Sequence, residues 1–307
     1  MEPFSHNIED YPEGIILPID KPYRWTSADV IRKVKYAAIR HFGKKNLKVG
    51  HAGTLDPLAT GILLVCIGPA TKKAEELQRS EKQYVAGVTF GATTPSYDLE
   101  KEIDCEYPLD GVSEESVRAM LPSFLGPQDQ VAPLFSAKSV DGVRAYELAR
   151  KMYKEHLKSG AAFDHEQSEL LSRQQINIYD LELLGYRPAG DTPGKPGAAR
   201  DHVNERGPLP QAVGGMERSG RFAGVSPEDQ PQDKNSRIHV ADISGYDLPT
   251  AMIRVDCSKG TYIRALARDW GEALGSGAFL SSLRRTKNGG FSIETAVSLD
   301  EVLALLA

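Results

Sequence analysis

The chain has 307 residues, of which 40% are hydrophobic and 26% are charged, and its formal net charge is −5. This composition is typical of a globular protein with enough core for one large domain or two small ones. No apolar run approaches the roughly 20 residues of a membrane span, and the acidic N-terminus does not resemble a secretory signal. The three cysteines are odd in number and widely spaced, which argues against a disulfide framework. We therefore expect a cytoplasmic protein without membrane contact.

The first predicted elements are a strand and a helix. Residues 14–21, GIILPIDK, predict a strand that ends before Pro22. Thr26 and Ser27 then offer N-cap oxygens, and apolar residues recur at helical spacing as far as His41. Gly43 is typical of the residue that ends such a helix. The helix should bury one stripe and expose its lysines.

The later segments alternate irregularly between short strands and short helices. Strands are predicted at 62–67, 84–90, 176–183 and 251–255, and helices at 72–78, 114–124, 146–157, 261–274 and 299–306. No regular βαβ alternation appears, and neither class of element is confined to one part of the chain. The pattern favours an α+β fold, with a mixed, mainly antiparallel central sheet and flanking helices.

The segment from Arg187 to Ser236 differs from the rest of the chain. Eight glycines and seven prolines fall within these 50 residues, and large apolar side chains are few. Such a segment buries too little surface to offset the entropy lost on ordering. We predict a disordered insertion between two strands of a single domain that spans residues 1–307.

Local basic patches are the main electrostatic feature of this acidic chain. Between Val30 and Leu55 there are seven Lys or Arg and no Asp or Glu, and a second basic cluster lies near the C-terminus. Most such runs are solvated surfaces, but the near absence of acids slightly favours contact with phosphates. If the protein binds nucleic acid, these patches are the expected contacts.

The first acid after that basic stretch is Asp56, in the segment KVGHAGTLDPLATGILLVCIG. Pro57 biases Asp56 toward an extended or turn conformation, while Gly50 and Gly53 allow close approach of another surface. A carboxylate among cations is expected to be charged, which suits a nucleophile better than a general acid. The alternative is a purely structural role, in which Asp56 and Pro57 form a turn that leads into a core strand.

No nucleotide-binding or metalloprotease motif occurs, and the histidines lack ligand spacing, so neither a cofactor nor a metal is expected.

The segment GHAGTLDPLATGILLVCIGPATK resembles the catalytic segment of the TruB family of bacterial tRNA pseudouridine-55 synthases. Four further segments resemble family motifs in the same order: DKPYRWTSADV, KQYVAGVTFGATTPSYDLE, APLFSAKSVDGVRAYELAR and CSKGTYIRALARDWGEALGSGAFLSSLRRTKNGGFS. The resemblance implies a pseudouridine-synthase fold and a cofactor-free isomerase that flips uridine 55 out of the T-loop of tRNA. The T-arm of tRNA would be the partner, and nothing in the sequence suggests more than a monomer.

The resemblance also implies three catalytic residues. Asp56 would be the nucleophile that assists cleavage of the N1–C1′ bond. Tyr84 would stack on the extruded base and assist proton removal at C5, although a core tyrosine would look the same in sequence. Arg264 would pair with Asp56, although its place in an amphipathic helix also suits a surface arginine.

Five residues are implied in substrate binding. Tyr262 and Leu283 would line the uracil pocket, and His51 would help to displace the target nucleotide. Lys21 and Lys72 match family positions near the site. Core packing for Leu283, a turn for His51 and a surface position for each lysine are the competing interpretations.

Two other classes of function remain open at this point. An RNA-binding module would share the basic patches but would not need an acid facing phosphates. A guide-RNA-dependent synthase of the dyskerin type is a further possibility. Many family members carry a C-terminal PUA domain, and we expect none here because the chain ends soon after a short predicted helix at 299–306.

Overall fold

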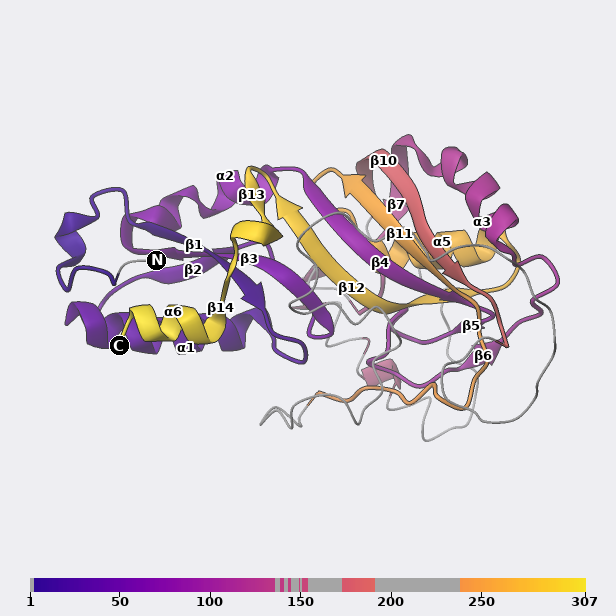
Figure 1. Cartoon of the computed structure of the whole chain (residues 1–307), viewed down its shortest axis with the longest axis horizontal. Coiled ribbons are helices and arrows are strands. Elements are labelled where there is room, and N and C mark those ends of the chain that lie inside the picture. Colours follow the sequence, from indigo (N-terminus) through magenta and orange to yellow (C-terminus); the bar gives the residue numbers. More distant parts are fainter. Residues whose placement is uncertain are drawn as a thin grey trace, which may run out of the picture.

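The computed structural model describes residues 3–135, 139–140, 143–144, 149, 151–153, 173–190 and 238–307. One long sheet runs through this part of the chain, with helices packed against it (Figure 1). Both termini lie at the same end of the molecule, beside α1 and α6. The predicted helix at 146–157 and the predicted disordered insertion fall mostly outside the described residues.

The sheet has ten strands, and eight of them form a continuous path. In spatial order these are β14 (Val297–Ser298), β1 (Ile15–Lys21), β3 (Ala59–Ile67), β12 (Ala278–Asn288), β4 (Lys82–Phe90), β11 (Thr250–Cys257), β10 (Arg173–Arg187) and β7 (Gly126–Val131). β2 (Val49–Ala52) pairs with β3, and β13 (Phe291–Ser292) pairs with β12. Two short hairpins, β5–β6 (Ala92–Thr93, Cys105–Glu106) and β8–β9 (Ser139–Val140, Val143–Arg144), stand apart.

Only the β1–β14 and β3–β12 pairs of this sheet are parallel among the described strands, and the other pairs are antiparallel. The predicted α+β fold with a mixed, mainly antiparallel sheet is therefore confirmed. The parallel β3–β12 pair sets Leu283 beside Ala59, three residues after Asp56. This register brings two segments that are more than 200 residues apart to one point at the middle of the sheet.

The helices pack on the sheet through apolar stripes. They are α1 (Ser27–Phe42), α2 (Ala74–Arg79), α3 (Glu114–Met120), α5 (Ile263–Ala273) and α6 (Leu299–Leu305), with 3₁₀ turns at η1 (Ile8–Asp10), η2 (Gly68–Lys73), η3 (Leu121–Phe124) and η6 (Ile293–Thr295). α1 begins with a capping box between Thr26 and Asp29, and the left-handed Gly43 ends it. Both ends match the prediction from the sequence. No described helix is long and apolar enough to cross a membrane.

α5 is the helix that carries residues into the site. Its core-facing side chains are buried against the sheet, and Trp270 is fully buried, edge-to-face with Phe124. Arg264, in the second position of the helix, is also buried, with 5% exposed. The interpretation of Arg264 as a surface arginine was therefore wrong, because the connecting segments that carry Asp56, Ser96 and Phe135 contact its guanidinium.

Candidate active site

Asp56 lies in the turn that joins β2 to β3. The Ala59 amide donates to the Asp56 carbonyl at 3.1 Å, and the Ser27 hydroxyl bonds both the amide and the carbonyl of Leu55. These bonds hold the turn against the start of α1. The Asp56 side chain remains 37% exposed, so the carboxylate is fixed in place and open to solvent.

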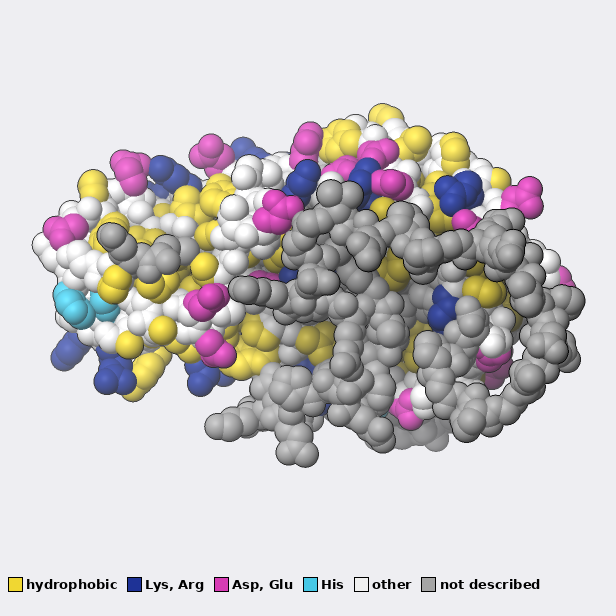
Figure 2. Space-filling view, viewed as in Figure 1, with side chains coloured by type: hydrophobic (Ala, Val, Ile, Leu, Met, Phe, Trp, Pro, Cys, Tyr) yellow, Lys and Arg dark blue, Asp and Glu magenta, His cyan; other side chains and the backbone are white. Residues whose placement is uncertain are grey.

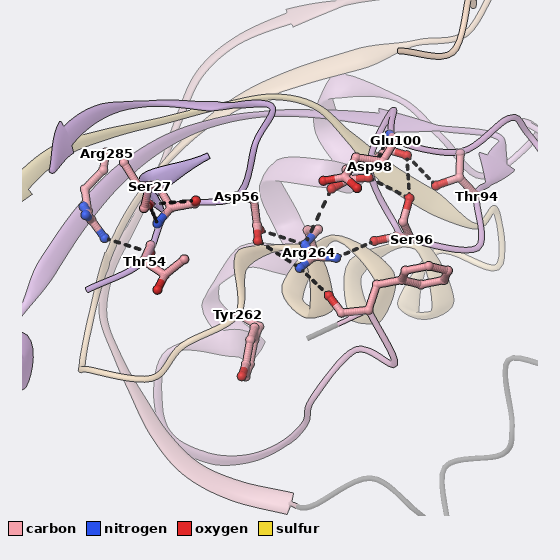
Figure 3. A network of polar contacts seen from close by, with 12 residues as sticks. Ser27, Thr54, Asp56, Thr94, Ser96, Asp98, Glu100, Tyr262, Arg264 and Arg285 are labelled. Atoms are coloured by element: carbon pink, nitrogen blue, oxygen red, sulfur yellow. Dashed lines mark hydrogen bonds and ion pairs between the residues drawn. The ribbon is translucent and has the colours of Figure 1, made fainter. Parts of the chain in front are cut away.

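The Arg264 guanidinium donates two hydrogen bonds to the Asp56 carboxylate (Figure 3). Its Nε donates to Asp56 Oδ2 at 2.9 Å, and a terminal nitrogen donates to Oδ1 at 3.2 Å. The other donors reach the carbonyls of Ser96 at 3.0 Å and Phe135 at 2.8 Å. A bidentate pair of this kind fixes the orientation of the carboxylate as well as its charge. The ion pair implied by the resemblance is thus present, across 208 residues of sequence.

Two further carboxylates lie near Arg264, the buried Asp98 and the partly buried Glu100, and neither was predicted from the sequence. Asp98 lies 3.7 Å from the Arg264 Nε and accepts hydrogen bonds from the Ser96 hydroxyl and the Glu100 amide. Burial raises the pKa of Asp98, and the Arg264 charge opposes this. Burial, together with the neighbouring charge of Asp98, raises the pKa of Glu100 to about 7. Burial would lower the pKa of Arg264, but the charges of Asp56, Asp98 and Glu100 outweigh it and raise that pKa.

One sequence signal could have indicated Asp98. It directly follows the small and weakly polar segment ATTPSY at 92–97, and a charged residue that is buried in such surroundings seldom lacks a partner. Tyr97, directly before it, has a φ of 55°, a backbone conformation that non-glycine residues adopt at a cost. Strain next to a buried charged pair is typical of a functional site.

A small cleft opens beside the Asp56–Arg264 pair. Its volume is about 20 Å³, roughly the space for one water molecule. Its lining includes both residues of the ion pair and Asp98, together with the apolar side chains of Leu58, Leu99, Leu280 and Leu283. Leu283 therefore shares this cleft with Asp56 and Arg264.

The two predicted tyrosines lie near this cleft but do not line it. Tyr84 is buried in β4 with 8% exposed, beside Arg285 of β12 and Val255 of β11 in the sheet register. Burial raises its pKa, and the Arg285 charge opposes this shift. Tyr262 is the N-cap of α5, and its backbone is held by the Gln130 side chain through bonds of 2.8 Å and 3.1 Å. Its ring points away from the Asp56–Arg264 pair (Figure 3).

Lys21 holds the turn that carries Asp56 through hydrogen bonds to backbone carbonyls. It is fully buried and donates to the carbonyls of Pro22, Trp25 and Pro57 at 2.9, 2.5 and 3.2 Å. Burial lowers its pKa to about 7, although the Asp56 charge opposes this. The interpretation of Lys21 as a surface lysine was therefore wrong.

His51 and Lys72 are the remaining residues that were predicted to bind substrate. His51 is on β2, where burial and then the Arg285 charge lower its pKa, and its buried Nδ1 has no hydrogen-bond partner among the described residues. Lys72 is exposed on η2 and does not line the cleft that holds Asp56. The structure thus brings Asp56, Arg264 and Leu283 into the lining of one cleft, whereas the other predicted site residues do not line it: Lys21, His51, Lys72, Tyr84 and Tyr262.

Arg285 is a second residue that the sequence analysis treated only as part of a basic patch. It is 1% exposed, and its guanidinium donates to the carbonyls of Ile62 at 2.7 Å, Gly53 at 3.1 Å and Thr54 at 3.5 Å. Gly53 and Thr54 directly precede Leu55 and Asp56. Arg285 therefore ties the turn that carries Asp56 to the middle of the sheet.

Comparisons with known proteins place this arrangement in a family. Solved structures of an archaeal box H/ACA sRNP Nop10–Cbf5 complex and of a Cbf5–Nop10–Gar1 complex share the fold, with TM-scores of 0.51 and 0.53 at 20% and 21% identity. They cover 97% of this chain, which spans 55% and 56% of those chains, and the likeness at this identity concerns the fold alone.

The sequence comparisons are more specific. Residues 40–189 match the model of the N-terminal domain of TruB family pseudouridylate synthases, and residues 264–307 match the tRNA pseudouridylate synthase B C-terminal domain. The tRNA pseudouridine synthase B of Phocaeicola vulgatus is 40% identical over 95% of this chain and 92% of its own. That of Bacteroides thetaiotaomicron is 42% identical over 93% and 90%, and that of Deinococcus deserti is 32% identical over 94% and 78%. The chain belongs to the TruB family of pseudouridylate synthases.

Proposed function

We propose that this protein converts uridine to pseudouridine in tRNA, and that its target is uridine 55 in the T-loop. Relatives named tRNA pseudouridine synthase B, similar over nearly the whole chain, support the reaction and the substrate. The position rests on the resemblance of the segment around Asp56 to the uridine-55 enzymes. The partner is the T-arm of tRNA. The chain binds it as a monomer, through one catalytic domain.

The single observation that carries the proposal is the Asp56–Arg264 pair at the edge of a small apolar cleft. Isomerisation of uridine breaks the N1–C1′ bond, turns the uracil and joins C5 to C1′. One proton leaves C5 and one is gained at N1, so nothing is oxidised or reduced. A charged carboxylate held rigidly beside the ribose can assist the bond cleavage, and the leucines of the cleft provide apolar contacts for the uracil.

The other residues then have distinct roles. Arg264 is a positioning residue that orients Asp56, and Asp98 in turn orients Arg264. Tyr84, next to the cleft, stacks on the base and assists the loss of the C5 proton, with Tyr262 and Leu283 at the edge of the pocket. His51, on β2, helps to displace the target nucleotide, Lys21 holds the turn that carries Asp56, and Lys72 contacts phosphate.

Removing a base from its stack costs a few kcal/mol, and this cost is lowest where the base is already partly unstacked. A tRNA loop meets that condition better than a helical stem.

The experiment that tests the position uses unmodified tRNA transcripts. The protein is incubated with a wild-type transcript and with one carrying cytidine at position 55, and pseudouridine is mapped by carbodiimide-dependent primer-extension stops. We expect one stop at position 55 in the first transcript and none in the second. A stop at another uridine in both transcripts would contradict the T-loop assignment and leave the reaction itself supported.

A further inference from the structure

A second hollow lies on the surface, apart from the cleft that holds Asp56. It has a volume of about 490 Å³ and is bordered by Lys35 of α1, by Lys45 and Lys48 of the turn after α1, and by Thr71 of η2. β2 contributes Val49 and Gly50 to its wall. We call it the β2 hollow. It shares no lining residue with the Asp56 cleft.

The turn beside the β2 hollow is firmly held. Leu47 is buried, its amide donates to the Lys44 carbonyl at 3.1 Å, and the Gly68 amide donates to the Lys48 carbonyl at 2.8 Å. The Thr71 hydroxyl in turn donates to the Gly68 carbonyl at 2.8 Å. The lysines of this turn therefore project from a fixed backbone, which reduces the entropy lost when they bind a ligand.

The charges of this region are distributed unequally. Lys44 and Lys73, which lie outside the β2 hollow, form ion pairs with Glu9 and Glu13 at 2.8 and 2.7 Å. Lys35, Lys45 and Lys48 are exposed, and no carboxylate of the described residues pairs with any of them. No Asp or Glu lines the hollow. Figure 2 shows Lys and Arg side chains along the edge of the molecule over α1. Three ammonium groups without counter-ions thus surround a space that can receive an anion.

Gly50 provides an independent sign of a ligand. A Cβ built on Gly50 meets no atom within 4 Å, and its φ is not in the left-handed region, so neither folding nor packing requires glycine there. The register of β2 on β3 is regular, which excludes a bulge as the reason. A glycine inside a regular strand often marks a place where a ligand approaches the backbone closely. β2 pairs with β3 alone among the described strands, so its outer edge is free.

We infer that the β2 hollow binds the phosphodiester backbone of the substrate RNA, beside the nucleotide that enters the Asp56 cleft. The inference rests on the proposed function. β2 leads directly from the hollow to the catalytic turn, and the eight residues from Lys48 to Asp56 span at most about 29 Å. One RNA arm can therefore contact both places. Lysine ammonium groups bind phosphate as point charges, so this contact holds the RNA without reading its sequence.

The test compares tRNA affinity at several salt concentrations for wild type and for the triple variant Lys35→Ala, Lys45→Ala and Lys48→Ala. Each phosphate contact contributes about 1 to the slope of log affinity against log salt, so we expect a slope shallower by about 2 to 3. The dissociation constant for tRNA should rise at least tenfold at low salt. The loss of activity should appear as a higher KM. Gly50→Val should melt no lower than wild type, because the added side chain stands in open space, and it should weaken tRNA binding by occupying part of the hollow.

Lys33→Ala is the matched control for Lys35→Ala. Both residues are exposed on α1, but positions two apart point to different sides of a helix, and Lys33 does not line the β2 hollow. Equal effects of these two substitutions, or a triple variant with the wild-type slope and affinity, would overturn the inference while an active wild-type enzyme left the proposed function intact. If instead the wild-type protein forms no pseudouridine but binds tRNA through these lysines, the proposed function is contradicted and the inference about the β2 hollow stands.

Discussion

At the scale of single residues, the site depends on one buried guanidinium shared by carboxylates of different exposure. Asp56 is partly open to solvent, whereas the side chain of Asp98 is 6% exposed and serves only Arg264 and its neighbours. Asp98 therefore holds the arginine whether or not substrate occupies Asp56. Removing one partner from such a buried pair is far more damaging than the net contribution of the pair suggests.

Replacement of Arg264 by lysine tests this arrangement. Lysine keeps the charge but cannot form two parallel bonds to Asp56 while donating to the carbonyls of Ser96 and Phe135. Because buried acceptors then lose their donors while the charge remains, we expect the free energy of unfolding to fall by about 1–3 kcal/mol. Single-turnover pseudouridine formation should slow by at least about tenfold, which corresponds to roughly 1.4 kcal/mol of lost orientation.

The matched control is Arg268→Lys in the next turn of the same helix, where the side chain pairs with Asp269. Urea unfolding and single-turnover rates are measured for both variants. Similar losses of rate in the two variants would contradict a specific role for Arg264.

The raised pKa of Glu100 predicts a pH dependence of stability. The folded protein keeps this proton up to about pH 7, whereas the unfolded chain releases it near the ordinary value of 4.5. The folded state therefore binds more protons between these values, and the free energy of unfolding should fall as pH rises through this window, by up to about 3 kcal/mol. Glu100→Gln should remove this component, so its stability relative to wild type should increase from pH 4.5 to 7. A constant difference in urea unfolding across that range would contradict the assignment.

At the scale of elements, the parallel pairing of β3 with β12 assembles the site. Gly61 lies opposite Arg285 in this pair, with a φ of 98°. A Cβ at Gly61 would lie 2.2 Å from the Arg285 carbonyl oxygen, so any side chain must push the two strands apart. The Arg285 guanidinium, which holds the turn before Asp56, would move with its strand.

Replacement of Gly61 by alanine should therefore destabilise the fold by roughly 2–4 kcal/mol, through both the backbone strain and the clash. Gly50→Ala is a control in a strand of the same sheet, where space is open and φ is ordinary. It should be neutral or stabilising by up to about 1 kcal/mol. Thermal and urea unfolding of both variants gives the comparison, and equal melting temperatures would show that the β3–β12 contact tolerates a side chain.

At the scale of the whole molecule, local signals in the sequence predicted the helices of the described residues well. Thr26 and Gly43 mark the ends of α1 as predicted, and the helix predicted at 299–306 is α6, which Ser298 caps. These features depend on neighbouring residues, which is why the sequence reveals them.

The missed features depend on contacts between distant segments. β12 was not predicted, because its Arg284, Arg285 and Lys287 resemble a solvated basic run, yet Arg285 is buried at the middle of the sheet. The role of Asp98 was missed for a related reason. Its partner Arg264 is 166 positions away, and no periodicity links them.

Asp56 is the residue on which the proposed isomerisation depends most directly. The most direct measurement is tritium release from C5-labelled uridine in unmodified tRNA, compared between wild type and Asp56→Asn. Asp98 remains as a partner for Arg264 in the variant, so we expect the variant to fold and to bind tRNA with little change. We expect tritium release by wild type and none by the variant. Release by Asp56→Asn at the wild-type rate would contradict this expectation.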